Sequence, residues 1–286
     1  MKTWRIIDLI HWTTQYFEQH DIPTPRLDVE LLLGHVLQKS RLQIYLNFDM
    51  PVFQDQLSAF RELVKKRVAR APVSYLTNHK EFMSLDFYVD SRVLIPRPET
   101  EMLVETVLKH QGVCRLIDIG TGSGAIAISL AVNRTDWGIF ATDISAAALE
   151  VAKRNADSHN VANRITFLQG DLFESVKELD NARFDWIVCN PPYVSADNRS
   201  TLEPDVRDYE PAIALFADAD GQDVIRRLIV EAPEFLKPDG KLALEIGHEQ
   251  SDHIQELIKS QPAYHTHRVI KDYAGIERIV VAEVAS

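Results

Sequence analysis

Residues 115–132 read RLIDIGTGSGAIAISLAV, and their pattern indicates the class of fold. An apolar run ends in a loop with three glycines, at positions 120, 122 and 124, and a second apolar run follows at helical spacing. The pattern predicts a buried β-strand that turns sharply into an α-helix. A unit of this kind opens the parallel sheet of an α/β protein, in which helices cover both faces.

The chain beyond residue 132 continues the alternation of strand and helix. Two final strand-like runs, HTHRVI and IVVAEV, have only KDYAGIER between them, so we expect an antiparallel pair at one edge of the sheet. With residues 115–120 there are seven strand-like runs, which predict a doubly wound, mostly parallel α/β sheet. The other four runs are GIFATD, ITFLQGD, FDWIVCN and KLALEIG.

The first 72 residues have a different pattern, which predicts a small helical N-terminal domain. Thr24 and Pro25 are typical of an N-cap followed by proline at the first helical position, and Ser40 is a second candidate cap. Alternation in KEFMSLDFYVDSRVLI predicts a β-hairpin within a linker of residues 73–95. PRPETE then breaks the pattern, and MLVETVLKH predicts the first helix of an α/β domain over residues 96–286.

Composition and charge exclude several classes of protein. The chain has 45% apolar and 26% charged residues, and no apolar run approaches the roughly 20 residues that span a bilayer. The N-terminal stretch lacks the features of a signal peptide, and two cysteines provide neither a disulfide framework nor a zinc pattern. We therefore expect a cytoplasmic protein without a structural metal.

The net charge of −11 is distributed unevenly. Residues 1–80 hold 11 Lys and Arg against 8 Asp and Glu, whereas the rest of the chain is acidic. An acidic main body argues against tight binding along a nucleic-acid backbone. The run RELVKKRVAR, with Lys65, Lys66 and Arg67, is either the solvated face of a structural helix or a surface for an acidic partner.

Three consecutive strand ends carry residues suited to an adenosine ligand. The glycines allow close approach of a ligand, Asp143 is placed to accept hydrogen bonds from ribose hydroxyls, and Asp171 can accept from an adenine amino group beside Leu172. Each has a structural alternative: a tight turn, a helix cap (a role that Ser145 fills better) and a turn aspartate. The loop also fits the loose nicotinamide fingerprint, so an NAD-dependent oxidoreductase stays open here.

The motif NPPY, residues 190–193, follows the fourth strand and narrows the chemistry. Two consecutive prolines stiffen the backbone, and the Asn190 side chain with the Pro191 carbonyl offers two acceptors for an –NH₂ group. Tyr193 offers a flat face on which a planar group can stack. Holding both N–H bonds aims the nitrogen lone pair at an electrophile, and the methyl group of S-adenosylmethionine suits an adenosine pocket.

DIGTGSG and NPPY resemble the motifs of S-adenosylmethionine-dependent methyltransferases that act on nitrogen, on a Rossmann-like methyltransferase sheet. One branch matches further. PVSYLTNHKEF, LIPRPETE, YEPAIALFADADG and LEIGHEQ are similar to motifs of the peptide-chain release factor glutamine methyltransferases, the PrmC or HemK family. The resemblance runs from about residue 70 to the C-terminus, and Asn78 stands where that family usually has glycine.

The resemblance implies transfer of methyl from S-adenosylmethionine to the Gly-Gly-Gln glutamine of release factors one and two, with residues 1–72 recognising the substrate. We expect a monomer that binds neither membrane nor nucleic acid directly; an adenine methyltransferase on DNA or RNA is the nearest alternative. The catalytic residues expected are Asn190, Pro191 and Tyr193, and Pro192 joins these three among the substrate-binding residues expected. The cofactor-binding residues expected are Gly120, Thr121, Gly122, Ser123, Gly124, Asp143, Asp171, Leu172 and Asn190.

Overall fold

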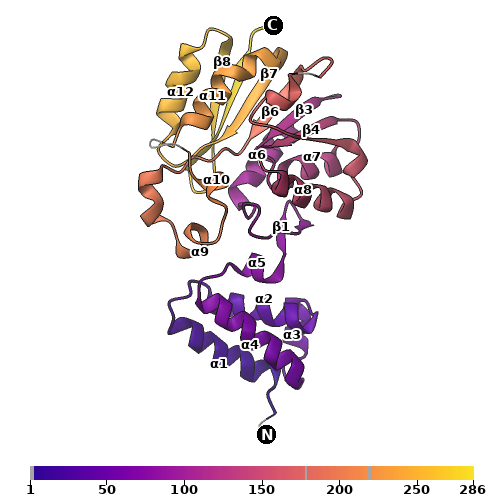
Figure 1. Ribbon diagram of the computed structural model, residues 1–286, viewed down its shortest axis with the longest axis vertical. Helices are drawn as coiled ribbons and strands as arrows, with labels where there is room; N and C mark the ends of the chain where they lie inside the picture. The colour runs from indigo at the N-terminus through magenta and orange to yellow at the C-terminus, as the bar shows by residue number, and fades with distance from the viewer. Residues whose placement is uncertain (1–2, 178, 218–220) are drawn as a thin grey trace. The chain divides into compact units, whose positions relative to one another are not determined.

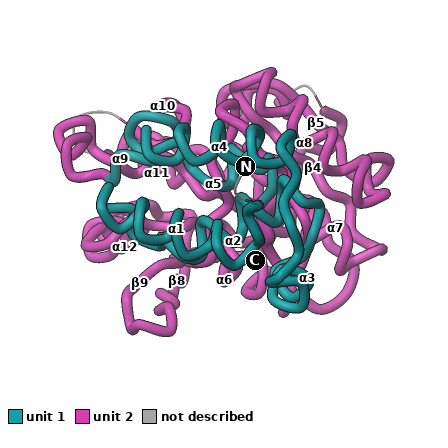
Figure 2. The backbone as a smooth tube through the Cα atoms, turned by 90° about the horizontal axis from the view of Figure 1, so that it is seen from below, with its two compact units in different colours: residues 1–79, 203–209 teal, residues 80–202, 210–286 magenta. Residues whose placement is uncertain are grey.

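The computed structural model describes residues 3–177, 179–217 and 221–286 (Figure 1). It contains two compact units, which Figure 2 distinguishes by colour. Unit 1 comprises Met1–His79 together with Glu203–Tyr209, and unit 2 comprises Lys80–Leu202 and Glu210–Ser286. The predicted linker, 73–95, is thus divided at residue 79. The assignment of 203–209 to unit 1 has no counterpart in the sequence prediction.

Unit 1 is helical, as its pattern predicted, around a core that includes Phe17, Leu33 and Phe60. The Ser40 side chain accepts a hydrogen bond from the Gln43 N–H and caps the third helix, which confirms that prediction. Thr24 lies at the predicted N-cap position, but its hydroxyl donates to Asp28 instead of capping the backbone. The helices are α1 (Ile6–Glu18), α2 (Pro25–Leu37), α3 (Arg41–Leu46), α4 (Gln54–Val68), α5 (Val73–Thr77) and α9 (Pro204–Arg207).

The structure corrects the interpretation of Arg67 as part of an exposed basic face. Its guanidinium is buried and donates to Asp28 at 2.7 Å and to Asp205 at 2.6 Å. Lys65 and Lys66, on the same helix, are exposed. Helical periodicity explains the difference, because Arg67 shares the inward face of α4 with Val64.

Unit 2 opens with the predicted hairpin, formed by β1 (Lys80–Phe82) and β2 (Leu85–Phe87). The strands are shorter than the alternation suggested, and both turn residues, Met83 and Ser84, have positive φ. Asn78 also takes the left-handed conformation, at φ 51°, where the resembled family usually has glycine. Asparagine tolerates this backbone better than most residues.

A seven-stranded sheet forms the centre of unit 2 and confirms the predicted fold class. Its order is β5-β4-β3-β6-β7-β9-β8. The first five strands are parallel, and β9 runs antiparallel to both of its neighbours, β7 and β8, so the final pair is antiparallel as expected. The last strand of the chain, β9, is not the edge strand but lies between β7 and β8. The strands are β3 (Arg115–Ile119), β4 (Gly138–Asp143), β5 (Ile165–Gln169), β6 (Phe184–Cys189), β7 (Leu236–Glu245), β8 (Tyr264–Lys271) and β9 (Glu277–Val284).

Helices cover both faces of the sheet (Figure 1). One apolar cluster joins the sheet to α6 (Pro98–Leu108), α7 (Ala125–Asn133) and α8 (Ala146–Ser158), and the other joins it to α11 (Asp223–Glu231) and α12 (Ser251–Ser260). Helix α6 begins at Pro98, inside PRPETE, because proline is well suited to the first helical position. The prediction that the helix starts only after this motif was wrong.

Short helices connect β6 to α11. They are η3 (Ala196–Thr201), α9 in unit 1, and α10 (Ala212–Leu215). Residues 218–220, which belong to the motif YEPAIALFADADG, lie outside the described residues. No helix in the described part of the chain has the length and apolar character needed to cross a membrane.

Strand register brings the predicted site residues together at the carboxyl ends of the parallel strands. Ile119 of β3 lies beside Cys189 of β6, and Cys189 lies beside Leu244 of β7. The residues that follow these three positions are therefore neighbours at the carboxyl ends of parallel strands. This is the edge at which α/β sheets bind ligands.

Candidate active site

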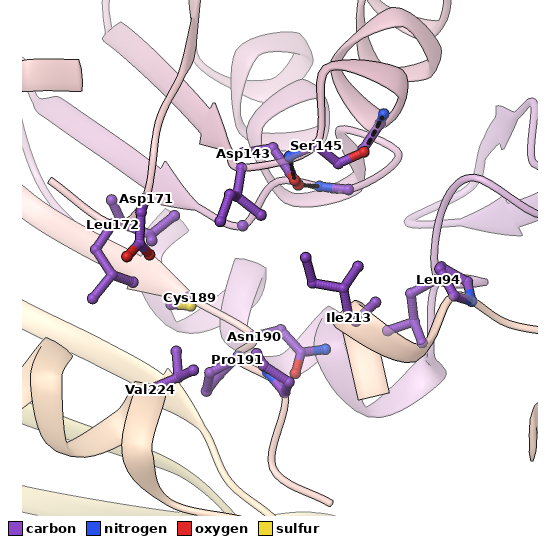
Figure 3. Close-up of a pocket in the computed structure, with 18 of the residues that line it drawn as sticks. Leu94, Asp143, Ser145, Asp171, Leu172, Cys189, Asn190, Pro191, Ile213 and Val224 are labelled. Carbon is purple, nitrogen blue, oxygen red and sulfur yellow. Dashed lines mark hydrogen bonds between the residues drawn. The ribbon is translucent and has the colours of Figure 1, made fainter. Parts of the chain in front are cut away.

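A cavity of about 310 Å³ lies at the carboxyl ends of β3, β4, β5 and β6. Figure 3 shows the side chains around it, with Asp143 and Ser145 on one side and Asn190 and Pro191 on another. The structure thus brings together residues from four separate strand ends. The predicted residues that line this cavity are Gly120, Gly122, Asp143, Asp171, Leu172, Asn190, Pro191 and Pro192.

The glycines of the loop after β3 differ in what they do. Gly120 and Gly122 have positive φ, and a Cβ added at either would meet no atom within 4 Å, so they keep the wall of the cavity open. A Cβ at Gly124 would lie 2.7 Å from Ile128 and 3.2 Å from the Ala152 side chain. Gly124 therefore permits close packing of α7 and α8 and does not line the cavity.

Thr121 and Ser123 also stand away from the main cavity. Both are buried, and they line a smaller pocket of about 50 Å³ that shares Gly120, Gly122 and Asn190 with the main one. The Thr121 hydroxyl donates to Asp118 at 2.7 Å, and burial raises the pKa of Asp118 to about 7. These contacts stabilise the glycine loop outside the main cavity.

Asp143 holds the glycine loop and reaches the cavity. One carboxylate oxygen accepts from the Gly122 N–H at 2.8 Å and the other from the Ser145 N–H at 2.9 Å. Burial raises its pKa, and the two backbone donors oppose that shift. Helix α8 is capped by Ser145, whose side chain accepts from the Ala148 N–H, so capping does not account for the carboxylate.

Asp171 lines the cavity but already has a charged partner. Its carboxylate accepts from Arg227 of α11 at 2.8 Å, and Arg227 also lines the cavity. Leu172 is buried with φ 47°, a conformation that directs the backbone after β5 around the cavity. Sequence reasoning missed Arg227, because nothing in its helix distinguishes it from other surface arginines.

An apolar wall of the cavity was also missed. Ile144 and Ile213 remain 49% and 57% exposed although both line the cavity. Together with Ala148 and Val224 they leave apolar surface open to a ligand. The signal available was the position of Ile144, which directly follows the acid at the end of β4. Ile213 comes from α10, which no pattern placed near the site.

The NPPY asparagine is part of a buried hydrogen-bonded chain. Asn190 Nδ2 donates to the Thr100 hydroxyl at 3.1 Å, and that hydroxyl donates to Glu245 at 2.6 Å. Burial raises the pKa of Glu245 to about 7, and nearby Glu99 adds to the shift, whereas Arg278 and Arg97 oppose it. Both Thr100 and Glu245 lie within motifs noted in the sequence, LIPRPETE and LEIGHEQ, but had no assigned role.

Tyr193 is not among the residues that line the cavity. Its ring packs against the apolar cluster that includes α11 and α12, and a Cβ at Gly247 would lie 3.0 Å from it. The Tyr193 carbonyl accepts from the Gln250 side chain at 3.2 Å. Burial raises the pKa of the phenol. The motif thus directs Asn190 and Pro191 to the cavity and anchors its last residue in unit 2.

Metal ligands are not gathered anywhere in the described ranges: no group of three or more His, Cys, Asp or Glu there could hold an ion. Cys114 and Cys189 are both buried free thiols. Cys189 lines the cavity, and burial raises its pKa well above the usual value. The cavity is lined by acceptor oxygens, glycines, apolar side chains and the guanidinium of Arg227.

Solved structures share this fold. A methyltransferase from Pyrococcus furiosus aligns with a TM-score of 0.53 and 20% identity over 82% of this chain and 100% of that one. The human methyltransferase 10 domain containing protein aligns with a TM-score of 0.51 and 19% identity, over 78% of this chain and 96% of that one. At such identities the likeness extends to the fold alone.

Sequence comparisons go further. The model of the PrmC N-terminal domain matches residues 8–77, and that of the methyltransferase small domain matches residues 98–203. The release factor glutamine methyltransferase of Chlorobaculum tepidum is 38% identical over 97% of this chain and 96% of its own. That of Moorella thermoacetica is 41% identical over 91% and 92%. These matches confirm the resemblance that LIPRPETE and NPPY indicated, and the chain belongs to the release factor glutamine methyltransferase family.

Proposed function

We propose that this chain transfers the methyl group of S-adenosylmethionine to the side-chain amide nitrogen of the glutamine in the Gly-Gly-Gln loop of release factors one and two. The observation that carries the proposal is the place of Asn190 and Pro191. They lie in the wall of the cavity that Asp143 and Gly120 also line. An acceptor pair suited to an amide thus faces the same space as an acid suited to a ribose.

The residues present fit the cofactor. Asp143 is a buried acid at the end of β4, Gly120 and Gly122 leave backbone surface open, and Ile144 and Ile213 offer apolar surface for a ring. Asp143 would hold the ribose hydroxyls, and the glycine loop would receive the amino-acid part. When bound, S-adenosylmethionine supplies an electrophilic methyl group on a sulfonium centre.

The chain's own contribution is to hold an amide nitrogen in one orientation. Its lone pair is delocalised and makes it a poor nucleophile. The Asn190 side-chain oxygen and the Pro191 carbonyl would each accept one N–H bond of the glutamine amide, and Pro192 keeps the Pro191 carbonyl rigid. Orientation of this kind supplies several kcal/mol of the barrier reduction, and it requires neither a metal nor a strong base.

The test is transfer of radiolabelled methyl from S-adenosylmethionine to purified release factor. Wild-type release factor should accept label, whereas a release factor with alanine in place of the Gly-Gly-Gln glutamine should not. Asn190→Ala should lower turnover by about 10²-fold while cofactor affinity stays nearly unchanged. Labelling of adenine-containing nucleic acid instead of release factor would favour the adenine alternative, and calorimetric binding of NADH would favour the oxidoreductase.

Substrate recognition by the N-terminal helices is a second part of the proposal. The basic surface of α4 consists of Arg61, Lys65 and Lys66, which are exposed. Arg67 does not belong to it, because its side chain is buried. Reversing these three charges should lower the rate of methylation most at low salt, since surface charges mainly accelerate encounter. Reversal of three exposed lysines of unit 2, Lys109, Lys153 and Lys259, is the matched control. Equal rates in the two triple variants would show that the α4 surface has no special role.

A further inference from the structure

We infer that Thr100 and Glu245 are positioning residues, which fix the end of the Asn190 amide that faces the substrate. The inference rests on the proposed function, since it concerns how Asn190 presents an acceptor to the glutamine amide. Neither residue lines the main cavity. Both act through a hydrogen-bonded chain that runs from Glu245 to Thr100 to Asn190.

Strand register brings the members of this chain together. Cys189 pairs with Leu244, so Asn190, which directly follows β6, lies beside Glu245, the last residue of the neighbouring parallel strand β7. Thr100 comes from the first turn of α6, 90 residues before Asn190 and 145 before Glu245. Thr100 is 4% exposed and Glu245 is 2% exposed. Thr100 also lines the smaller pocket beside Asn190, whereas Glu245 lines neither of these two pockets, and each of the two side chains has its protein partner.

The direction of the hydrogen bonds follows from the chemistry of the groups. The carboxylate form of Glu245, which predominates above its pKa of about 7, can only accept, so the single hydroxyl hydrogen of Thr100 is donated to it. The Thr100 oxygen is then left as an acceptor, and the neighbouring end of Asn190 has to be its –NH₂ group. Because the amide is planar with its oxygen opposite the nitrogen, Oδ1 is the end left for a ligand.

The alternative orientation would be unproductive. An Asn190 amide rotated by half a turn would present its own –NH₂ group to the glutamine –NH₂ group, and two donors do not bond. It would also place two oxygens, Oδ1 and the Thr100 hydroxyl oxygen, against each other without a hydrogen between them. A buried acid beyond the hydroxyl is therefore the element that decides the orientation. Packing alone does not account for this acid, since burying a carboxyl group is unfavourable unless it is hydrogen-bonded.

The first test compares Thr100→Val with Thr100→Ser in the release factor assay. Valine keeps the shape of threonine but removes the hydroxyl, whereas serine keeps the hydroxyl. Thr100→Val should lower kcat about tenfold or more, with cofactor affinity and the KM for release factor within about twofold of wild type. Thr100→Ser should recover most of the lost rate. Wild-type kcat in the valine variant, or equal loss in both variants, would refute the positioning role.

The second test reverses the donor and acceptor roles along the hydrogen bonds that join Glu245, Thr100 and position 190. Asn190→Asp places a second carboxylate beside the one hydroxyl hydrogen and should lower kcat strongly. Glu245→Gln added to it supplies a donor to Thr100. The Thr100 hydroxyl can then donate to the carboxylate introduced at position 190, whose other oxygen is left as the acceptor for substrate. The double variant should turn over at least about fivefold faster than Asn190→Asp alone, although Glu245→Gln alone slows the enzyme. A double variant no faster than Asn190→Asp would overturn the inference.

The wild-type protein in the same assay separates the two proposals. Absence of methyl transfer to release factor by wild type refutes the proposed function. Normal transfer by wild type together with normal transfer by Thr100→Val refutes the positioning role and leaves the proposed function intact.

Discussion

Arg67 offers the sharpest test of how unit 1 is held together. Its guanidinium donates at 2.7 Å to Asp28 and at 2.6 Å to Asp205, and the side chains of Arg67 and Asp28 are only 4% and 6% exposed. Arg67→Ala leaves Asp28 buried without its cation. Removing one partner of a buried ion pair destabilises a protein by about 3–5 kcal/mol, because the remaining charge is uncompensated. We expect a loss of that size in the free energy of unfolding of unit 1.

Lys66→Ala is the matched control, since it removes one positive charge from the same helix at an exposed position. Its effect should stay within about 0.5 kcal/mol. Hydrogen exchange of the α2 and α4 amides in the full chain measures the stability of this unit without interference from the sheet. Amides of 203–209 should also exchange faster in Arg67→Ala, because Asp205 loses its partner. Exchange rates equal to those of Lys66→Ala would show that the Arg67 ion pairs do not stabilise unit 1.

Three further predictions concern the sheet unit. Asp143→Ala should weaken S-adenosylmethionine binding by about 1.5–3 kcal/mol in a calorimeter, since hydrogen bonds to ribose and to the glycine loop are both lost; unchanged affinity would contradict either role. Gly221→Ala should lower turnover with little change in cofactor binding, because Gly221 has a φ of +74° and the new Cβ would lie 2.6 Å from the Tyr193 carbonyl oxygen. Wild-type kinetics would show that turnover does not depend on the contact between Gly221 and the Tyr193 backbone. Glu245→Gln should flatten the pH dependence of stability. Between the unfolded pKa of 4.5 and the folded pKa of about 7, Glu245 keeps its proton in the folded protein but loses it in the unfolded chain, so the stability of the wild type falls as the pH rises through this range. The fall is at most about 3 kcal/mol, and equal losses in wild type and variant between about pH 5 and about pH 8 would disprove it.

The sequence predicted the parts of the molecule that depend on local pattern. Strand–helix alternation identified the sheet, and glycines, acids and prolines at strand ends identified the site edge. The same reasoning failed where residues meet only through tertiary structure. Nothing local relates Thr100 to Glu245, since only the order of β6 and β7 and the position of α6 bring them together.

Arg67 illustrates a second reason for failure. A basic run is usually solvated, and composition does not reveal which member of the run turns inward. The helical spacing between Val64 and Arg67 would have suggested that Arg67 is buried. Its carboxylate partner Asp205 could not be foreseen, because it lies 138 residues further along the chain. Helix α10, with Ile213, was likewise hidden, because a four-residue helix leaves no periodic signal.

The assignment of 203–209 to unit 1 has a consequence for anyone who builds chimeras from this family. The chain enters unit 1 a second time at Glu203 and leaves it after Tyr209, so a crossover near residue 79 alone would not transplant the whole unit. The Tyr209 hydroxyl donates to the Ala69 carbonyl at 2.5 Å, and Asp205 pairs with Arg67, so a foreign helical bundle would meet an unmatched segment. An exchange of unit 1 between relatives should therefore carry two inserts, the N-terminal helices and this seven-residue stretch.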